Sequence, residues 1–339
     1  MIVAMWNYLL ELTQSEVQVK RKLPSAHNDL VIMANELSIR LHIDIDENNI
    51  NESALKVLEI VRPSWDKHEI RFTSFREGRM NILLGCYIDG NFDKDVVLLR
   101  KYGNNTSILV DREAETEIIK TLSKEGICMP LYAILNNGIA YGFVHGEKLT
   151  VDTVRDEHIS RLIAKEMAKL HSIKTKKDNP KPSLFDKLDT WIEYIPNTHE
   201  DPVLPSRFIL SQEKEKLKQE LQFMECPAVL CHNDLGITNI IYNKEKDEVK
   251  FIDFEFAGYN HSAFDIGEHF CEYAGVSGVD HGTYPDKDYQ LKWIRNYLTY
   301  LKEYNNEEDR PVTDKDVENL YIQANKFAPI LVIYATSIP

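Results

Sequence analysis

The chain has 339 residues, of which 43% are hydrophobic and 28% charged, a composition typical of a soluble globular protein with room for two lobes. Its formal net charge of −14 argues against nucleic acid or an anionic membrane as a main partner. The five cysteines form no CxxC pair, so they indicate neither a zinc site nor a disulfide framework but reduced thiols in the cytoplasm. We expect no integral membrane segment, because no stretch reaches the ~20 apolar residues that a membrane helix needs.

The order of predicted elements divides the chain into three parts. Residues 1–50 carry weak helical signals and much charge, and we expect an N-terminal extension. Residues 51–146 predict a small β-rich lobe: a helix ending at Pro63, strands near 70–73, 82–88 and 96–102, a helix at 111–123, and strands at 131–135 and 140–144. Residues 147–339 predict a larger, mostly helical lobe, with helices at 159–173, 211–224 and 265–274. The fold class is therefore α+β with two lobes.

A motif in the second lobe carries the clearest chemistry. His232 and Asp234 are followed, five residues after the aspartate, by Asn239. Asp253 comes after two short predicted strands joined by a polar turn. An amide oxygen beside a carboxylate suits Mg²⁺, and a separate aspartate can take a proton from an attacking hydroxyl. This is the layout of a kinase catalytic loop followed by a metal-binding aspartate. The alternative is that these side chains only cap turns, which leaves their kinase-type spacing unexplained.

The two strands between the motifs predict how they meet. If Tyr242 lies opposite Val249, then Asn239 lies nearly opposite Asp253. The hairpin would thus bring the amide and the second carboxylate to one end, with Asp234 a loop away.

The first lobe has weaker nucleotide-binding signals. The turn before the strand at 82–88 contains Gly78 and Asn81, and a single glycine alone is more typical of an ordinary hairpin. Arg100 ends an apolar strand, where an unpaired charge is costly, so we expect a partner for it. Glu115 on the next helix is that partner by analogy with protein kinases. The alternative is that Glu115 lies on a solvated helix face, like its neighbours at 113 and 117.

The helix predicted at 265–274 places Asp265, His269 and Glu272 within a narrow arc, beside a mostly apolar stripe. Read from the residues alone, this arc is either a solvated acidic face or a functional one. In the functional reading, Asp265 braces the catalytic loop and Glu272 neutralises an amine.

Longer matches over residues 61–285 point to one family. The sequences are RPSWD at 62–66, VVLLRKYGNNT at 96–106, CHND at 231–234, FIDFEFAGYN at 251–260 and AFDIGEHFCEYAGV at 263–276. With these marks the chain resembles the choline/ethanolamine kinase family, and more closely its ethanolamine branch. That family has a protein-kinase-like two-lobed fold.

The resemblance implies ATP and Mg²⁺ as cofactors and a role for each matching residue. It implies that Asp234 is the catalytic base and that Glu272 faces the substrate ammonium. The remaining roles are Asn239 and Asp253 as Mg²⁺ ligands, Glu255 at a second metal, Asn81 and Arg100 at the ATP phosphates, and Gly142, Phe143 and Val144 as the hinge under adenine. Gly78 of the turn and Glu115, as the partner of Arg100, are expected at the same nucleotide site.

Three departures from the family pattern stand out. Met80 replaces the hydroxyl residue of the phosphate loop, and Gly142 stands where a glutamate is common. After Ala328 the chain lacks the tryptophans that wall the amine site in the family, and the final helix.

The resulting hypothesis is ATP-dependent phosphorylation of ethanolamine, the first step of the CDP-ethanolamine route to phosphatidylethanolamine. The alternatives are a choline kinase, another small-molecule kinase, and a catalytically weak binding or regulatory protein. A quaternary ammonium favours an aromatic cage, so the missing tryptophans weigh against choline. A homodimer is left open.

Overall fold

A computed structural model describes residues 39–75, 81–90, 92, 94–103, 106, 110–174, 181–195, 206–222, 224–274, 281–307 and 309–337. The chain divides into two compact units. One, here the sheet unit, holds the described residues of Leu10–Ser107 and Met129–Phe143. The other, the helical unit, holds those of Ile108–Cys128 and Val144–Pro339. The predicted helix at 111–123 is thus grouped with the helical unit, and one of the points where the chain passes between the units lies between Phe143 and Val144.

The sheet unit is built on one six-stranded sheet, with strand order β1-β5-β6-β4-β3-β2. All neighbours pair antiparallel except β1, which runs parallel to β5. Its elements are β1 (Ile39–Arg40), η1 (Glu47–Asn49), α2 (Ile50–Val61), β2 (Ile70–Phe75), β3 (Asn81–Ile88), β4 (Val96–Tyr102), β5 (Leu131–Leu135) and β6 (Gly138–Gly142).

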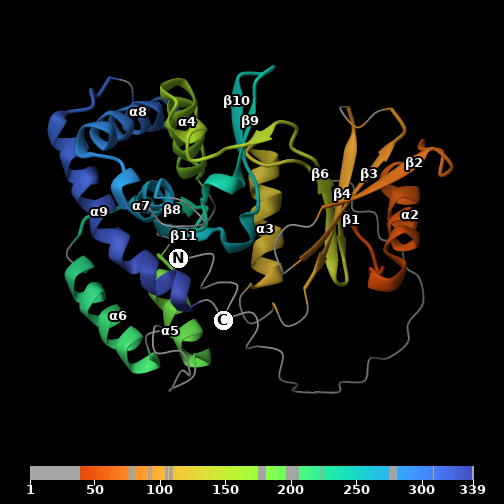
Figure 1. Ribbon diagram of the computed structural model, residues 1–339, viewed down its shortest axis with the longest axis horizontal. Coiled ribbons are helices and arrows are strands. Elements are labelled where there is room, and N and C mark those ends of the chain that lie inside the picture. The colour runs from red at the N-terminus through yellow and green to blue at the C-terminus, as the bar shows by residue number, and fades with distance from the viewer. Residues whose placement is uncertain are drawn as a thin grey trace. The chain divides into compact units, whose positions relative to one another are not determined.

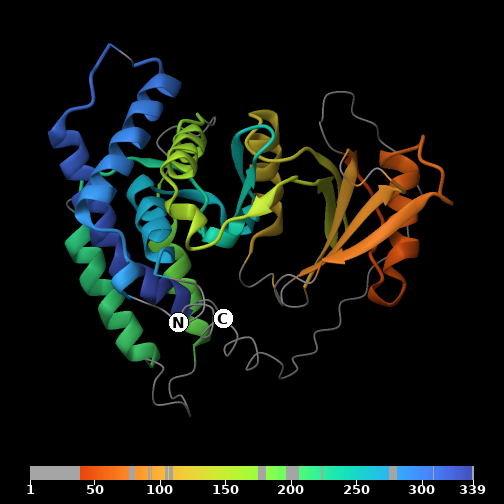
Figure 2. The same cartoon turned by 45° about the horizontal axis from the view of Figure 1, so that its top comes forward.

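One face of this sheet is covered by α2 (Figure 2). Val57 and Leu58 of the helix pack with Val97 and Leu99 of β4 in one hydrophobic core. Side chains alternate along a strand, so Arg100 points to the other face. Residues 39–50, expected in an N-terminal extension, contribute β1 and η1 to this unit, and both Leu41 and Ile45 are buried in the same core.

The helical unit contains most of the helices and two small sheets, one of strands β10-β9-β7 and one of strands β11-β8. Its helices are α3 (Arg112–Lys124), η3 (Thr153–Arg155), α4 (Glu157–His171), α5 (Leu184–Tyr194), α6 (Arg207–Leu221), η4 (Ile237–Asn239), η5 (Phe254–Phe256), α7 (Ser262–Glu272), η6 (His281–Thr283), α8 (Lys287–Asn305) and α9 (Asp314–Ser337). Its strands are β7 (Glu147–Lys148), β8 (Ala228–Cys231), β9 (Ile240–Asn243), β10 (Glu248–Phe251) and β11 (Gly258–His261).

Helix α7 lies at the centre of this unit. It packs on α9 and on β8, while α4 and α8 lie side by side (Figure 1). Its apolar stripe is fully buried, with Ile266, Phe270 and Tyr273 each 0% exposed. The helix can approach α9 closely because it carries Gly267, where a Cβ would lie only 2.6 Å from the backbone oxygen of Ala324. Helix α7 is therefore a rigid support for whatever packs on its remaining face.

The predicted hairpin is confirmed. Strands β9 and β10 pair antiparallel with Tyr242 opposite Val249, and β7 pairs with the other edge of β9. The backbone N–H of Ile252 donates to the oxygen of Asn239 at 3.0 Å, which carries the pairing to the end that bears Asn239 and Asp253.

Helix α9 runs through Pro329 to Ser337, so the stretch after Ala328 is helical. None of the helices in the described part of the chain has the length and apolar character that crossing a bilayer requires.

Candidate active site

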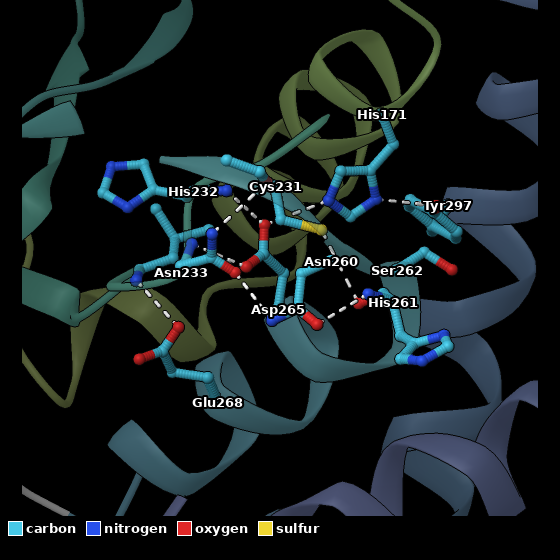
Figure 3. A network of polar contacts seen from close by, with 12 residues as sticks. His171, Cys231, His232, Asn233, Asn260, His261, Ser262, Asp265, Glu268 and Tyr297 are labelled. Carbon is cyan, nitrogen blue, oxygen red and sulfur yellow. Dashed lines mark hydrogen bonds and ion pairs between the residues drawn. The ribbon is translucent and has the colours of Figure 1, made fainter. Parts of the chain in front are cut away.

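The segment between β8 and η4 has the backbone of a constrained loop. Asn233 adopts a left-handed conformation with φ 63°, which costs free energy for a residue other than glycine. Its side chain is held on both sides. The amide nitrogen donates to the oxygen of Phe256 at 3.1 Å, and the amide oxygen accepts from Asn260 Nδ2 at 2.8 Å. This network fixes the residue immediately before Asp234 (Figure 3).

Asp265 of α7 holds the backbone of the same loop. This is the role predicted for it if the acidic side chains of the helix at 265–274 are functional. It accepts the backbone N–H of His232 at 2.7 Å and of Asn233 at 2.8 Å (Figure 3). It also accepts from His171 Nε2 at 3.0 Å, and Nδ1 of that histidine is hydrogen-bonded to the hydroxyl of Tyr297 at 2.8 Å. Burial raises the pKa of Asp265, but the hydrogen bond from His171 and the other contacts outweigh it, so the pKa stays below its usual range. With Asp265 and His269 both 0% exposed, a solvated acidic face is the wrong reading.

His171, Cys231 and Asp265 also have the residue types of a metal site, with ligand atoms within 4.8 Å of one another. Their polar atoms are already used within the protein. Both carboxylate oxygens of Asp265 accept hydrogen bonds, and the Cys231 thiol donates to the oxygen of His261 at 3.6 Å. Burial raises the pKa of this thiol, which keeps it protonated and a poor ligand. The trio is a structural brace.

Asp234 is half-buried and lies next to Asn239. The Asn239 Nδ2 donates to the backbone oxygen of Asp234 at 2.9 Å, and the N–H of Gly236 donates to the same oxygen at 3.0 Å. Asn239 thus joins the catalytic loop to the end of the hairpin. Asp253 follows there as an exposed residue in the left-handed region, with φ 66°.

Burial, together with neighbouring negative charges at Asp234, governs the electrostatics of this region. The pKa of Asp234 is raised well above its usual range, first by burial and then by the charges of Asp253, Glu272 and Glu255. Glu272 is half-buried, and its pKa is raised by burial although a hydrogen bond to the backbone of Ile237 opposes this. A bound cation would stabilise these carboxylates in their charged form.

Glu115 is buried, 2% exposed, whereas its neighbours at 113 and 117 are exposed, so the solvated reading of this residue is wrong. Arg112 of the same helix donates from Nη1 to Glu115 Oε2 at 2.8 Å and to Glu255 Oε2 at 3.2 Å. This partnership was missed, although the i, i+3 spacing of Arg112 and Glu115 is a signal for it. Arg112 ties α3 to the segment that follows Asp253. The pairing of Glu115 with Arg100 stays a prediction.

The expected nucleotide contacts of the sheet unit are placed as follows. Gly78 lies outside the described residues. Asn81 is the first residue of β3, and Arg100 lies in β4, buried to 5% exposure. Gly142 ends β6, and the ring of Phe143 stacks on that of Phe75 at 5.8 Å between centroids. Val144 belongs to the helical unit. The nucleotide-binding roles of all these residues stay predictions.

A β-rich unit, then a braced loop that bears Asp234, then a hairpin before Asp253 is the order of elements in the protein-kinase-like fold. Residues 72–335 match the model of the choline/ethanolamine kinase family, and the chain belongs to that family. Membership in a kinase family implies the use of ATP.

Curated relatives agree with this membership. The chain is 42% identical over 294 residues to ethanolamine kinase 1 of Homo sapiens, covering 84% of this chain and 65% of the human protein. The same identity holds against ethanolamine kinase 1 of Mus musculus, with 84% and 80% covered. With 65% covered, the chain spans less than two thirds of the human relative's length.

Solved structures confirm the fold. A Plasmodium vivax ethanolamine kinase superposes with a TM-score of 0.71 at 22% identity, covering 85% of this chain and 81% of that one. A choline kinase from Cryptosporidium parvum gives 0.67 at 21% identity, covering 85% and 90%. The predicted two-lobed protein-kinase-like fold is thus confirmed.

Proposed function

We propose that the protein transfers the terminal phosphoryl group of ATP to the hydroxyl of ethanolamine, the first step of the CDP-ethanolamine route to phosphatidylethanolamine. The observation that carries this proposal is the carboxylate Glu272 of α7, placed beside the catalytic loop that bears Asp234. A Cβ at Gly236 would lie 3.1 Å from Glu272 Oε2. A small substrate with a cationic end and a hydroxyl end fits two carboxylates with these separate tasks. The ethanolamine kinases among the relatives support the same choice.

In this proposal Asp234 orients the substrate hydroxyl and accepts its proton as the new phosphate ester bond forms. Asp265 and the hydrogen bonds of Asn233 hold the loop backbone, so the carboxylate is already in place when substrate binds.

The donor set around Asp234 fits Mg²⁺. Asn239 uses its amide nitrogen on the oxygen of Asp234, which makes its amide oxygen the natural ligand atom. Asp253 and Glu255 supply carboxylate oxygens from the adjoining segment, and Arg112 holds one oxygen of Glu255 in place. When bound, the cation would neutralise charge on the phosphates and relieve the repulsion among these carboxylates.

We further place the protein in the cytoplasm, supported by five cysteines that are all free thiols. A homodimer remains a prediction.

The test is steady-state kinetics of the purified protein with ATP and Mg²⁺, on ethanolamine and on choline in parallel. A primary ammonium can donate hydrogen bonds to Glu272 and a quaternary one cannot. Charge-assisted bonds contribute about 1.5–3 kcal/mol, so we expect kcat/KM for ethanolamine to exceed that for choline by at least about tenfold. A reaction without acceptor measures ATP hydrolysis, and phosphorus NMR identifies the product. A preference for choline, or hydrolysis without transfer, would reject the proposal.

A further inference from the structure

Helix α7 presents a second acidic side chain to the catalytic loop, one turn after Asp265. Glu268 is half-buried, and its Oε2 accepts the backbone N–H of Leu235 at 3.1 Å (Figure 3). Asp265 holds the N–H groups of His232 and Asn233 in the same way. The two carboxylates therefore accept backbone N–H groups on both sides of Asp234: Asp265 before it and Glu268 after it.

The bond to Leu235 matters because of the peptide group to which that N–H belongs. The same peptide group carries the backbone oxygen of Asp234, and that oxygen accepts from Asn239 Nδ2 at 2.9 Å. One peptide group is thus held at both ends, its N–H by Glu268 and its oxygen by Asn239. Because a peptide group is planar, fixing both ends fixes its orientation and with it the ψ angle of Asp234.

We propose that Glu268 is a positioning residue for the reaction: by holding the peptide group between Asp234 and Leu235, it restricts the backbone of Asp234 and so helps to place the Cα–Cβ bond from which the carboxylate extends. The inference rests on the proposed function for the role of Asp234, but the contact itself does not. Glu268 is distinct from Glu272, which lies one turn further along α7 and faces Gly236.

The contact with Leu235 also places Glu268 near the carboxylates of Asp234 and Asp265. The pKa of Glu268 is raised well above its usual range, first by burial and then by the charges of Asp234 and Asp265, while the hydrogen bond from Leu235 lowers it. A neutral acceptor of the same shape would hold the N–H without this repulsion. Glutamine is such an acceptor, and methionine has similar length but no acceptor oxygen.

The experiment compares Glu268→Gln with Glu268→Met, and Glu303→Met, an exposed position on α8, serves as control. Two quantities are measured: hydrogen exchange of the amides in residues 232–239, and kcat and KM with ATP, Mg²⁺ and ethanolamine. Exchange reports the contact without needing catalysis.

For Glu268→Met we expect faster exchange at Leu235 and a kcat lower by about tenfold or more, with KM for both substrates within about twofold. For Glu268→Gln we expect wild-type exchange and a kcat within about threefold of wild type, because the amide oxygen still accepts the bond. The control should match wild type in both measurements.

Three outcomes would overturn the inference. Unchanged exchange in Glu268→Met would mean that the peptide is held without Glu268. Faster exchange with unchanged kcat would mean that the bond does not position the base. A raised KM for ethanolamine in both variants would instead make Glu268 a direct partner of the ammonium. If wild-type protein fails to phosphorylate ethanolamine, the proposed function fails, and the exchange comparison still decides whether Glu268 holds the loop.

Discussion

Glu272 lies against the catalytic loop, and a Cβ added at Gly236 would be 3.1 Å from its Oε2. If its carboxylate binds the ammonium of ethanolamine, Glu272→Gln removes a charge-assisted hydrogen bond. We expect KM for ethanolamine to rise by about tenfold or more. The KM for choline should rise less, because choline loses only a Coulomb interaction. Steady-state kinetics on both amines measures this, and equal effects on the two would contradict the hydrogen bond.

Lys187 of α5 is a second residue whose environment predicts a measurable effect. Its Nζ donates to the oxygen of Phe256 at 2.9 Å, and burial lowers its pKa to about 8. Below pH 8 folded and unfolded chains both hold the proton. Between about pH 8 and 10.5 the unfolded chain holds it and the folded chain does not, so folding is favoured as the pH rises.

Lys187→Met should remove this dependence. We expect the free energy of unfolding of wild type, relative to the variant, to increase by on the order of 2 kcal/mol across that window. Urea denaturation of both proteins at pH 7 and pH 10 measures the difference, which cancels the titration of other groups. A constant difference between the two proteins would show that Lys187 keeps its ordinary pKa.

Among the elements, α7 depends on close contact with α9. A Cβ at Gly267 would lie 2.6 Å from the oxygen of Ala324, a backbone atom that cannot move alone. Gly267→Ala should therefore destabilise the protein by about 1–3 kcal/mol, although alanine is the better helix former. Chemical denaturation measures this, and Gly258→Ala is the matched control because its nearest neighbours lie at 3.8–3.9 Å. Equal or greater stability of Gly267→Ala would show that the two helices can separate freely.

Elements with strong local signals were predicted from the sequence, and weak ones were not. Strands β4 and β5 and the register of the β9–β10 hairpin follow from apolar runs and turn residues, and they are confirmed. Strand β1 was missed because two residues give no periodic pattern, and its parallel pairing with β5 depends on tertiary contacts.

The polar contacts of the site were predicted less fully. The brace by Asp265 was one of two open readings, because an acidic arc on a helix is also typical of a solvated face. The roles of His171, Arg112 and Glu268 were not foreseen, since each depends on a partner brought close only by the fold: Asp265, Glu255 and Leu235.

On the scale of the whole molecule, a member of the choline/ethanolamine kinase family with a net charge of −14 is expected to bind a nucleotide together with a cation. A ligand that binds only the folded protein raises its stability, by about 2.7 kcal/mol at a concentration 100 times its Kd. Mg²⁺ with ATP should act in this way. Because Asp234 is proposed as the base and not as a metal ligand, a neutral side chain of the same shape at this position should leave the ligands for Mg²⁺ with ATP in place.

The most direct test is therefore kcat of Asp234→Asn, measured with ATP, Mg²⁺ and ethanolamine alongside the thermal shift produced by Mg²⁺ and ATP. The variant keeps the shape of the side chain but cannot accept a proton. We expect kcat to fall by at least about 100-fold, with the thermal shift retained. A kcat within about tenfold of wild type would contradict the assignment of Asp234 as the catalytic base.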